Sequence, residues 1–109
     1  MEINHYQKEA HKTARYVKIG EDYVYPTLGL AGEAGELANK VKKIFRDKGG
    51  RIDEETKEAI QQELGDILWY AAEIATVLGI PLEDVANANL EKLSSRNNRG
   101  VIGGSGDNR

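Results

Sequence analysis

Two stretches of this sequence, thirty residues apart, repeat one pattern, and this repeat limits what the chain can fold into. Glu33–Leu37 reads Glu-Ala-Gly-Glu-Leu, and Glu63–Ile67 reads Glu-Leu-Gly-Asp-Ile, so each position carries the same chemical type. Apolar residues recur around both stretches at the three- and four-residue spacing of an amphipathic helix. Each stretch is therefore expected to lie in the middle of an α-helix.

Acidic residues flank the apolar stripe of each predicted helix. The stripes are Leu30, Ala34, Leu37, Val41, Ile44 and Phe45 in the first helix, and Ile60, Leu64, Ile67, Ala71, Ile74 and Leu78 in the second. On the flanks, at about 100° per residue, lie Glu33, Glu36 and Lys40 in the first helix and Glu63, Asp66 and Tyr70 in the second. Helices packed through these stripes would bring four carboxylates together at one edge of a bundle.

Four neighbouring carboxylates would repel each other, and a divalent cation resolves that conflict. The chain has no cysteine, and its two histidines, His5 and His11, both lie near the N-terminus. Oxygen ligands alone favour Mg²⁺, or Mn²⁺, over zinc. A single Glu-x-x-Glu pair is usually a solvated helix face, but two pairs in matching register favour a metal site. The predicted ligands are Glu33, Glu36, Glu63 and Asp66.

Four glycines lie inside these helices, next to the acidic pairs. Each glycine costs about 1 kcal/mol relative to alanine in a helix interior. We interpret them as places where a second helix or a ligand approaches the backbone closely. They are Gly29, Gly32, Gly35 and Gly65.

The remaining signals predict an all-α chain of four helices, over residues 4–17, 26–47, 53–79 and 81–95. Asn4 and Asp53 are the expected N-caps, and Pro26 suits a first helical turn. A length of 109 residues corresponds to one domain. We expect a four-helix bundle over residues 1–96, completed by oligomerisation, followed by a glycine-rich, loop-like tail over residues 97–109.

The composition indicates which classes of partner the chain can bind. Fifteen basic and eighteen acidic residues give a net charge of −3, which offers no basic face for nucleic acid. The apolar run Ile67–Ala72 is too short to cross a bilayer, and the N-terminus does not resemble a signal peptide. We therefore expect a cytoplasmic protein that binds neither nucleic acid nor membrane. Apolar residues outside the stripe of the helix over residues 53–79, Trp69 among them, predict a homo-oligomer, either dimer or tetramer.

The two acidic motifs resemble those of the MazG-like, all-α nucleoside triphosphate pyrophosphohydrolases. That superfamily carries Glu-x-x-Glu on one helix and Glu-x-x-Asp on the next. Its third element, Asn-x-x-Lys-x-x-x-Arg, matches here as Asn89, Lys92 and Arg96. The resemblance covers about residues 3–96 and is closest to the single-domain members.

The resemblance implies Mg²⁺-dependent hydrolysis of (deoxy)nucleoside triphosphates between the α- and β-phosphates, for nucleotide-pool housekeeping. The products would be a nucleoside monophosphate and pyrophosphate. Glu36 or Glu33 would orient or deprotonate the attacking water. The expected substrate contacts are Asn89, Lys92, Arg96, Lys40 and Tyr70.

Other interpretations stay open. A related bundle hydrolyses phosphoribosyl-ATP, and others are restricted to dUTP or dCTP. Outside the enzyme class, the chain could be a non-catalytic helical adaptor that binds a partner through an exposed apolar face. Taken alone, Lys92 and Arg96 would be ordinary surface charges, and Tyr70 could simply pack.

Overall fold

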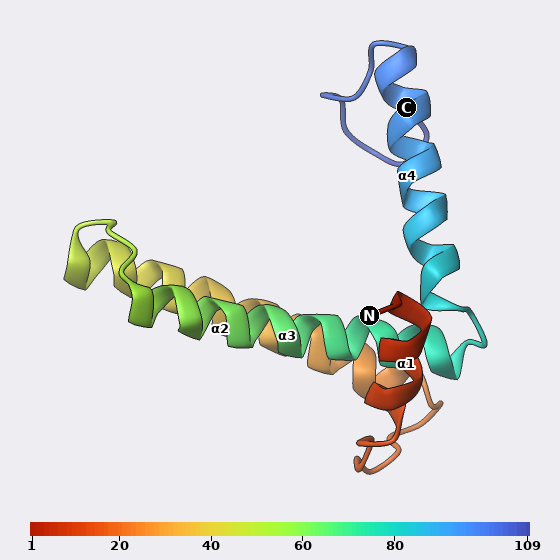
Figure 1. The fold of residues 1–109 in the computed structure, drawn as a ribbon, viewed down its shortest axis with the longest axis horizontal. Helices are drawn as coiled ribbons and strands as arrows, with labels where there is room; N and C mark the ends of the chain where they lie inside the picture. The colour runs from red at the N-terminus through yellow and green to blue at the C-terminus, as the bar shows by residue number, and fades with distance from the viewer.

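The computed structural model describes residues 1–109 and consists of four α-helices without a strand, which confirms the all-α class. The helices are α1 (Ile3–His11), α2 (Val24–Lys48), α3 (Glu54–Val77) and α4 (Leu82–Asn98). In Figure 1, α2 and α3 form a long antiparallel hairpin, α1 lies across one end of it, and α4 projects from the same end. No helix alone has the length and apolar character to cross a membrane; only α3 and α4 together, as a pair bent by 105°, meet both conditions.

A tight turn at the far end of the hairpin fixes how α2 and α3 pair. Gly49 and Gly50 have φ angles of 61° and 83°, the left-handed region that glycine adopts without strain. Asp53 caps α3 as predicted, because its Oδ1 accepts the Thr56 N–H at 2.8 Å. Lys48 then joins the two helices by donating to Asp53 Oδ2 at 3.0 Å and to Thr56 Oγ1 at 2.9 Å.

Close approach of the two helices requires a glycine at one position. A methyl group on Gly29 of α2 would overlap the ring of Tyr70 on α3. The expected close approach is therefore confirmed at Gly29. It does not account for Gly32, Gly35 or Gly65, where an added Cβ would meet no other part of the chain within 4 Å.

Side chains of α1 hold the start of α4. The Glu83 N–H donates to Asn4 Oδ1 at 2.9 Å, and the Leu82 N–H donates to Gln7 Oε1 at 2.7 Å. The expectation that Asn4 caps its own helix was therefore wrong. Glu2 takes that position without a side-chain hydrogen bond, and Asn4 satisfies an otherwise unpaired N–H of a different helix.

The first helix is shorter than expected, since it ends at His11 and not at Val17. Tertiary contacts hold the next segment in a non-helical path. The Tyr16 hydroxyl donates to Glu73 Oε2 at 2.6 Å, and its ring stacks on Tyr25 with centroids 4.8 Å apart. These long-range contacts outweigh a local helical preference that is worth only tenths of a kcal/mol per residue.

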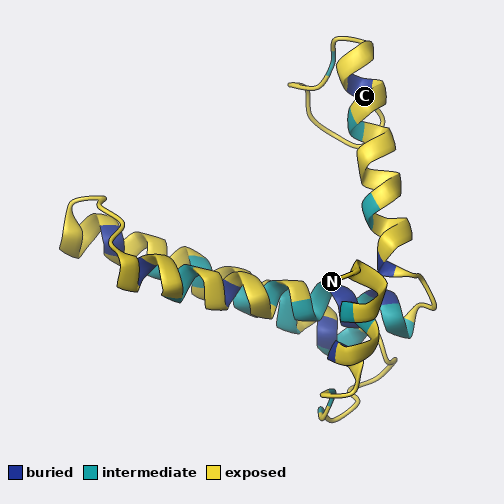
Figure 2. Ribbon diagram, in the orientation of Figure 1, coloured by how far each residue is buried: buried dark blue, intermediate teal, exposed yellow.

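The chain buries little of its apolar surface. Ala72, Ala75 and Leu82 form a small core with Tyr6 where α1, α3 and α4 meet, and most of the remaining ribbon is exposed (Figure 2). The radius of gyration is 16.7 Å, whereas a compact domain of this length has about 13 Å. Large exposed apolar residues on the helices include Leu28, Val41, Phe45, Leu64, Leu68, Val85 and Leu90. No contact joins α4 to α2, so α4 does not close a bundle around the hairpin.

The contact at Gly29 predicts opposite effects for two similar substitutions. Gly29→Ala forces the Tyr70 ring aside, and such overpacking costs about 1–3 kcal/mol. Gly32→Ala, one turn further along α2, meets open space and should stabilise the helix by roughly 1 kcal/mol. Thermal unfolding should show a lower melting temperature for the first variant and a higher one for the second. Equal shifts in the same direction would contradict the close approach.

Candidate active site

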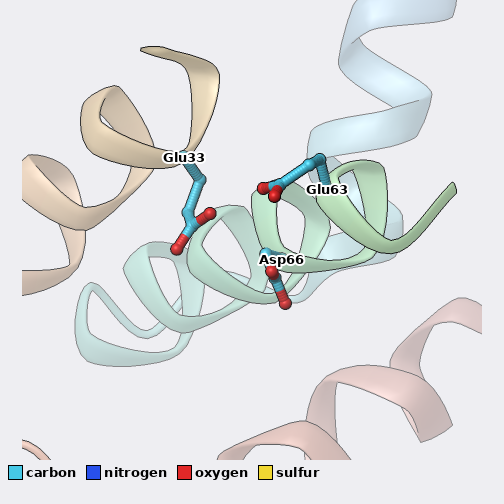
Figure 3. Close-up of side chains that lie close together, drawn as sticks. All are labelled: Glu33, Glu63 and Asp66. Carbon is cyan, nitrogen blue, oxygen red and sulfur yellow. The ribbon is translucent and has the colours of Figure 1, made fainter. Parts of the chain in front are cut away.

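Three of the four predicted metal ligands meet across the helical hairpin. Glu33 projects from α2 toward Glu63 and Asp66 of α3 (Figure 3). One carboxylate oxygen from each residue lies within 4.8 Å of those from the other two. Glu63 is only 8% exposed, Glu33 is half-buried and Asp66 is exposed. We call these three residues the carboxylate cluster.

Glu36, the fourth predicted ligand, lies outside this cluster. It follows Glu33 by one turn on α2, and its side chain is exposed to solvent. Its charge still reaches the cluster, where it adds to the influences that raise the pKa of Glu33. A direct metal contact from Glu36 stays a prediction.

Two acids of the carboxylate cluster, Glu33 and Glu63, have pKa values shifted in opposite directions. The adjacent Glu63 carboxylate, with which Glu33 can share a proton, raises the pKa of Glu33, and burial and the charges of Asp66, Glu63 and Glu36 raise it further. Glu63 behaves in the opposite way. Its Oε1 lies 2.8 Å from Lys40 Nζ, and this bond, followed by the proximity of Glu33 as a proton donor, lowers the pKa of Glu63.

The cluster suits a hard divalent cation. Its potential ligands are all carboxylate oxygens, which Mg²⁺ and Mn²⁺ prefer. Oε2 of Glu63 is buried and has no hydrogen-bond partner, which is costly for an ionised group. A cation bound to this oxygen would remove that penalty and offset the repulsion among the three acids.

An aromatic cavity of about 310 Å³ opens beside the cluster. Glu33 and Asp66 form part of its wall, and Thr13, Trp69 and Tyr70 form the rest. The Trp69 indole donates to Thr13 Oγ1 at 2.8 Å and packs edge-on against Tyr70, with centroids 5.0 Å apart. Trp69 was expected at an interface between copies of the chain. Within the chain it contacts Thr13 and Tyr70, and a contact with a second copy stays a prediction.

The predicted residues on α4 lie away from the cluster. Asn89 and Lys92 are exposed, and α4 makes no contact with α2. The C-terminal tail folds back on this helix, so Asp107 Oδ1 lies 3.3 Å from Lys92 Nζ and 3.5 Å from an Arg96 nitrogen. Arg96 also donates to the Gly106 carbonyl and is 4% exposed. The chain does not bring its own basic α4 residues to its carboxylate cluster.

Comparison with known proteins identifies the family. The model of the MazG nucleotide pyrophosphohydrolase domain matches residues 26–101, which include all three cluster residues and the α4 motif. The chain belongs to the MazG nucleotide pyrophosphohydrolase family. This result confirms the resemblance noted in the sequence.

Three relatives of this MazG protein extend the comparison. Gene 37 protein of Mycobacterium phage L5 is 52% identical over the full length of both chains. Uncharacterized protein YvdC of Bacillus subtilis is 39% identical, over 62% of this chain and 68% of its own. Uncharacterized protein YpjD of the same organism is 30% identical, over 75% of this chain and 77% of its own. No solved structure matches the chain.

The structure also shows residues that the sequence analysis missed. Thr13 of the cavity wall lies before the matched MazG domain and in no recognisable motif. Glu73 is a buried carboxylate that binds both Tyr16 and His11, the latter through His11 Nδ1 at 2.9 Å. Helical spacing could have identified Glu73, because it follows Asp66 by seven residues and so lies on the same flank of α3. The role of Thr13 depends on tertiary packing, and no local signal marks it.

Because the pKa of Glu33 is raised, we expect the substitution Glu33→Gln to stabilise the folded protein in a pH-dependent way. A raised carboxyl pKa favours the folded protein at low pH, and this contribution is lost as the pH rises through the folded-state pKa. Glu33→Gln keeps a neutral side chain at every pH. With a chelator present, its melting temperature should exceed that of the wild type at pH 7, and the difference should shrink toward pH 4. Glu58→Gln, which removes an exposed charge elsewhere on α3, should show no such pattern.

Proposed function

We propose that this MazG domain hydrolyses (deoxy)nucleoside triphosphates between the α- and β-phosphates, in a reaction that requires Mg²⁺. The products are a nucleoside monophosphate and pyrophosphate. The observation that carries the proposal is the carboxylate cluster itself. Three acids from two helices converge, one of their oxygens is buried without a partner, and an aromatic cavity opens beside them.

The roles of the acids follow from their environments. Glu33, Glu63 and Asp66 would hold the cation, and Glu36, one turn along α2, is the fourth predicted ligand. Bound Mg²⁺ supplies charge neutralisation for the triphosphate and acidifies a coordinated water. Glu36 or Glu33 would orient or deprotonate the attacking water. Glu36 lies outside the cluster, so its carboxylate is not shared with Glu63 and Asp66.

The cavity beside the cluster supports an orientation for the nucleotide. Its wall combines an indole, a phenol and a hydroxyl, groups that can stack on and hydrogen-bond a nucleoside. Glu33 and Asp66 border the same space, so a nucleoside bound there has its α-phosphate close to the cluster. Lys40 lies next to the cluster, where it forms an ion pair with Glu63, and its ammonium is suited to bind the β- and γ-phosphates. Tyr70 belongs to the nucleoside side in this arrangement.

Oligomerisation belongs to the proposal. Leu64 is 52% exposed and Leu68 is 43% exposed, and both lie on α3 next to the cluster. Exposed apolar residues of this size along a helix usually mark a contact between proteins. Because α4 makes no contact with α2 and projects away from the hairpin (Figure 1), Asn89, Lys92 and Arg96 would act on a neighbouring copy in a dimer or tetramer.

The proposed role is removal of unwanted nucleotides from the cytoplasmic pool. Phosphoribosyl-ATP, dUTP and dCTP remain alternative substrates, since selectivity depends on a few contacts in the aromatic cavity. The non-catalytic adaptor is the alternative outside the enzyme class, and it gives no reason for the convergence of three acids.

Pyrophosphate release from a panel of canonical and modified nucleoside triphosphates tests the activity. We expect release that requires Mg²⁺ and yields the monophosphate. Glu63→Gln and Asp66→Asn should each reduce the rate by at least about a hundredfold, since each removes a charge that holds the cation at the reacting phosphate. Glu58→Gln is the matched control and should retain the wild-type rate.

The result separates the alternatives. Cleavage of one pyrimidine nucleotide alone would restrict the substrate class, and cleavage of phosphoribosyl-ATP alone would replace it. If no nucleotide is cleaved and calorimetry detects no Mg²⁺ binding, the enzyme proposal fails and the adaptor remains.

Sedimentation velocity tests the assembly. The wild type should sediment as a dimer or tetramer. Replacing both Leu64 and Leu68 with glutamine should shift it toward the monomer, because the contact loses its apolar surface. Val17→Gln is the control, since Val17 is 78% exposed but lies outside the helices. A wild-type protein that sediments as a monomer at all concentrations would contradict the proposal.

A further inference from the structure

Lys40 is the one basic side chain that forms an ion pair with the carboxylate cluster. Its Nζ lies 2.8 Å from Oε1 of Glu63, and the Lys40 side chain is 36% exposed against 11% for Glu63. Neither Glu33 nor Asp66 has an ion-pair partner. Lys40 thus carries the positive charge that the cluster receives from the protein itself, and it places that charge on the most buried of the three acids.

Lys40 also borders a second cavity, which lies toward the turn that joins α2 and α3. This groove between α2 and α3 has a volume of about 330 Å³, and its wall carries three lysines, Lys40, Lys43 and Lys48, together with the acids Asp47 and Glu55. Lys48 is bound to Asp53 and Thr56. The groove and the aromatic cavity share no lining residue, so they are separate spaces.

Two cations cannot occupy the same carboxylate without repulsion. A divalent cation bound to Glu63 brings two positive charges close to the Lys40 ammonium. The lysine side chain has a flexible four-carbon stem and is partly exposed, so it can turn from Glu63 into the groove at little cost. There it would face the phosphates that extend from the cluster away from the aromatic cavity.

We propose that Lys40 is an exchangeable counter-ion: it pairs with Glu63, leaves that carboxylate when a divalent cation binds, and then binds the terminal phosphates of the substrate from the lysine-lined groove. This inference rests on the proposed function, because it assumes that the carboxylate cluster holds a metal ion. It adds a link between metal binding and recognition of pyrophosphate. The phosphate-binding charge becomes available only after the metal is in place.

Calorimetric titration with Mg²⁺ tests the first half of the exchange. Lys40→Met removes the competing ammonium, so its affinity for Mg²⁺ should exceed that of the wild type by about five- to tenfold. Lys42→Met loses the same charge from the opposite face of α2 and should stay within about twofold of the wild type. Lys40→Arg keeps the competing charge and should resemble the wild type. Thermal unfolding gives an independent readout, because added Mg²⁺ should raise the melting temperature most in Lys40→Met.

Titration of inorganic pyrophosphate into the Mg²⁺-saturated protein tests the second half. Lys40→Met should bind pyrophosphate at least about tenfold more weakly than the wild type, whereas Lys42→Met should bind it equally well. Compared with Lys42→Met, Lys40→Met should therefore bind Mg²⁺ more tightly and pyrophosphate more weakly. A purely structural role of Lys40 would weaken both.

The outcomes separate this inference from the proposed function. A wild-type protein that does not bind Mg²⁺ removes the basis of both. A wild-type protein that binds Mg²⁺, with equal affinities in Lys40→Met and Lys42→Met, overturns the exchange alone. Unchanged pyrophosphate affinity in Lys40→Met overturns the role of this residue in phosphate binding.

Discussion

The pairing of α2 with α3 is the contact on which the rest of this structure depends. It begins at the turn where Gly49 adopts a left-handed conformation and Asp53 caps α3, and it is fixed at the other end by the Tyr70 ring over Gly29. Between these two points the register of the helices sets Glu33 opposite Glu63 and Asp66. A shift of one residue would rotate each acid by about 100° and separate the carboxylates.

Bringing three carboxylates together costs free energy through their mutual repulsion. The residues around them respond in different ways. Glu33 responds with a raised pKa, whereas the Lys40 ammonium keeps Glu63 ionised. One buried oxygen of Glu63 still lacks a partner. Such a site is less stable than an apolar packing of the same helices would be, which is a common feature of sites selected for function and not for stability. Membership of the MazG family is consistent with this interpretation.

The monomer is unusually open for its length. Its small core lies where α1, α3 and α4 meet, and α1 holds the first turn of α4 with Asn4 and Gln7. That arrangement points α4 away from the hairpin, at a bend of 105° from α3 (Figure 1). The basic residues of α4 and the carboxylate cluster therefore occupy different parts of one chain. Both arms remain largely exposed (Figure 2), and apolar residues are among those in contact with solvent.

The sequence by itself determined the four helices, the cap at Asp53 and the acidic flanks, because these depend on spacing and on neighbours within one turn. It also determined the family, because the acidic motifs and the α4 motif lie at characteristic separations. Tertiary structure alone decided the early end of α1, the use of Asn4 to cap α4, and the place of Trp69 beside the cluster. It also set Glu36 outside the cluster and bound Lys40 to Glu63. Each of these depends on contacts between residues distant in the chain, to which local periodicity does not extend.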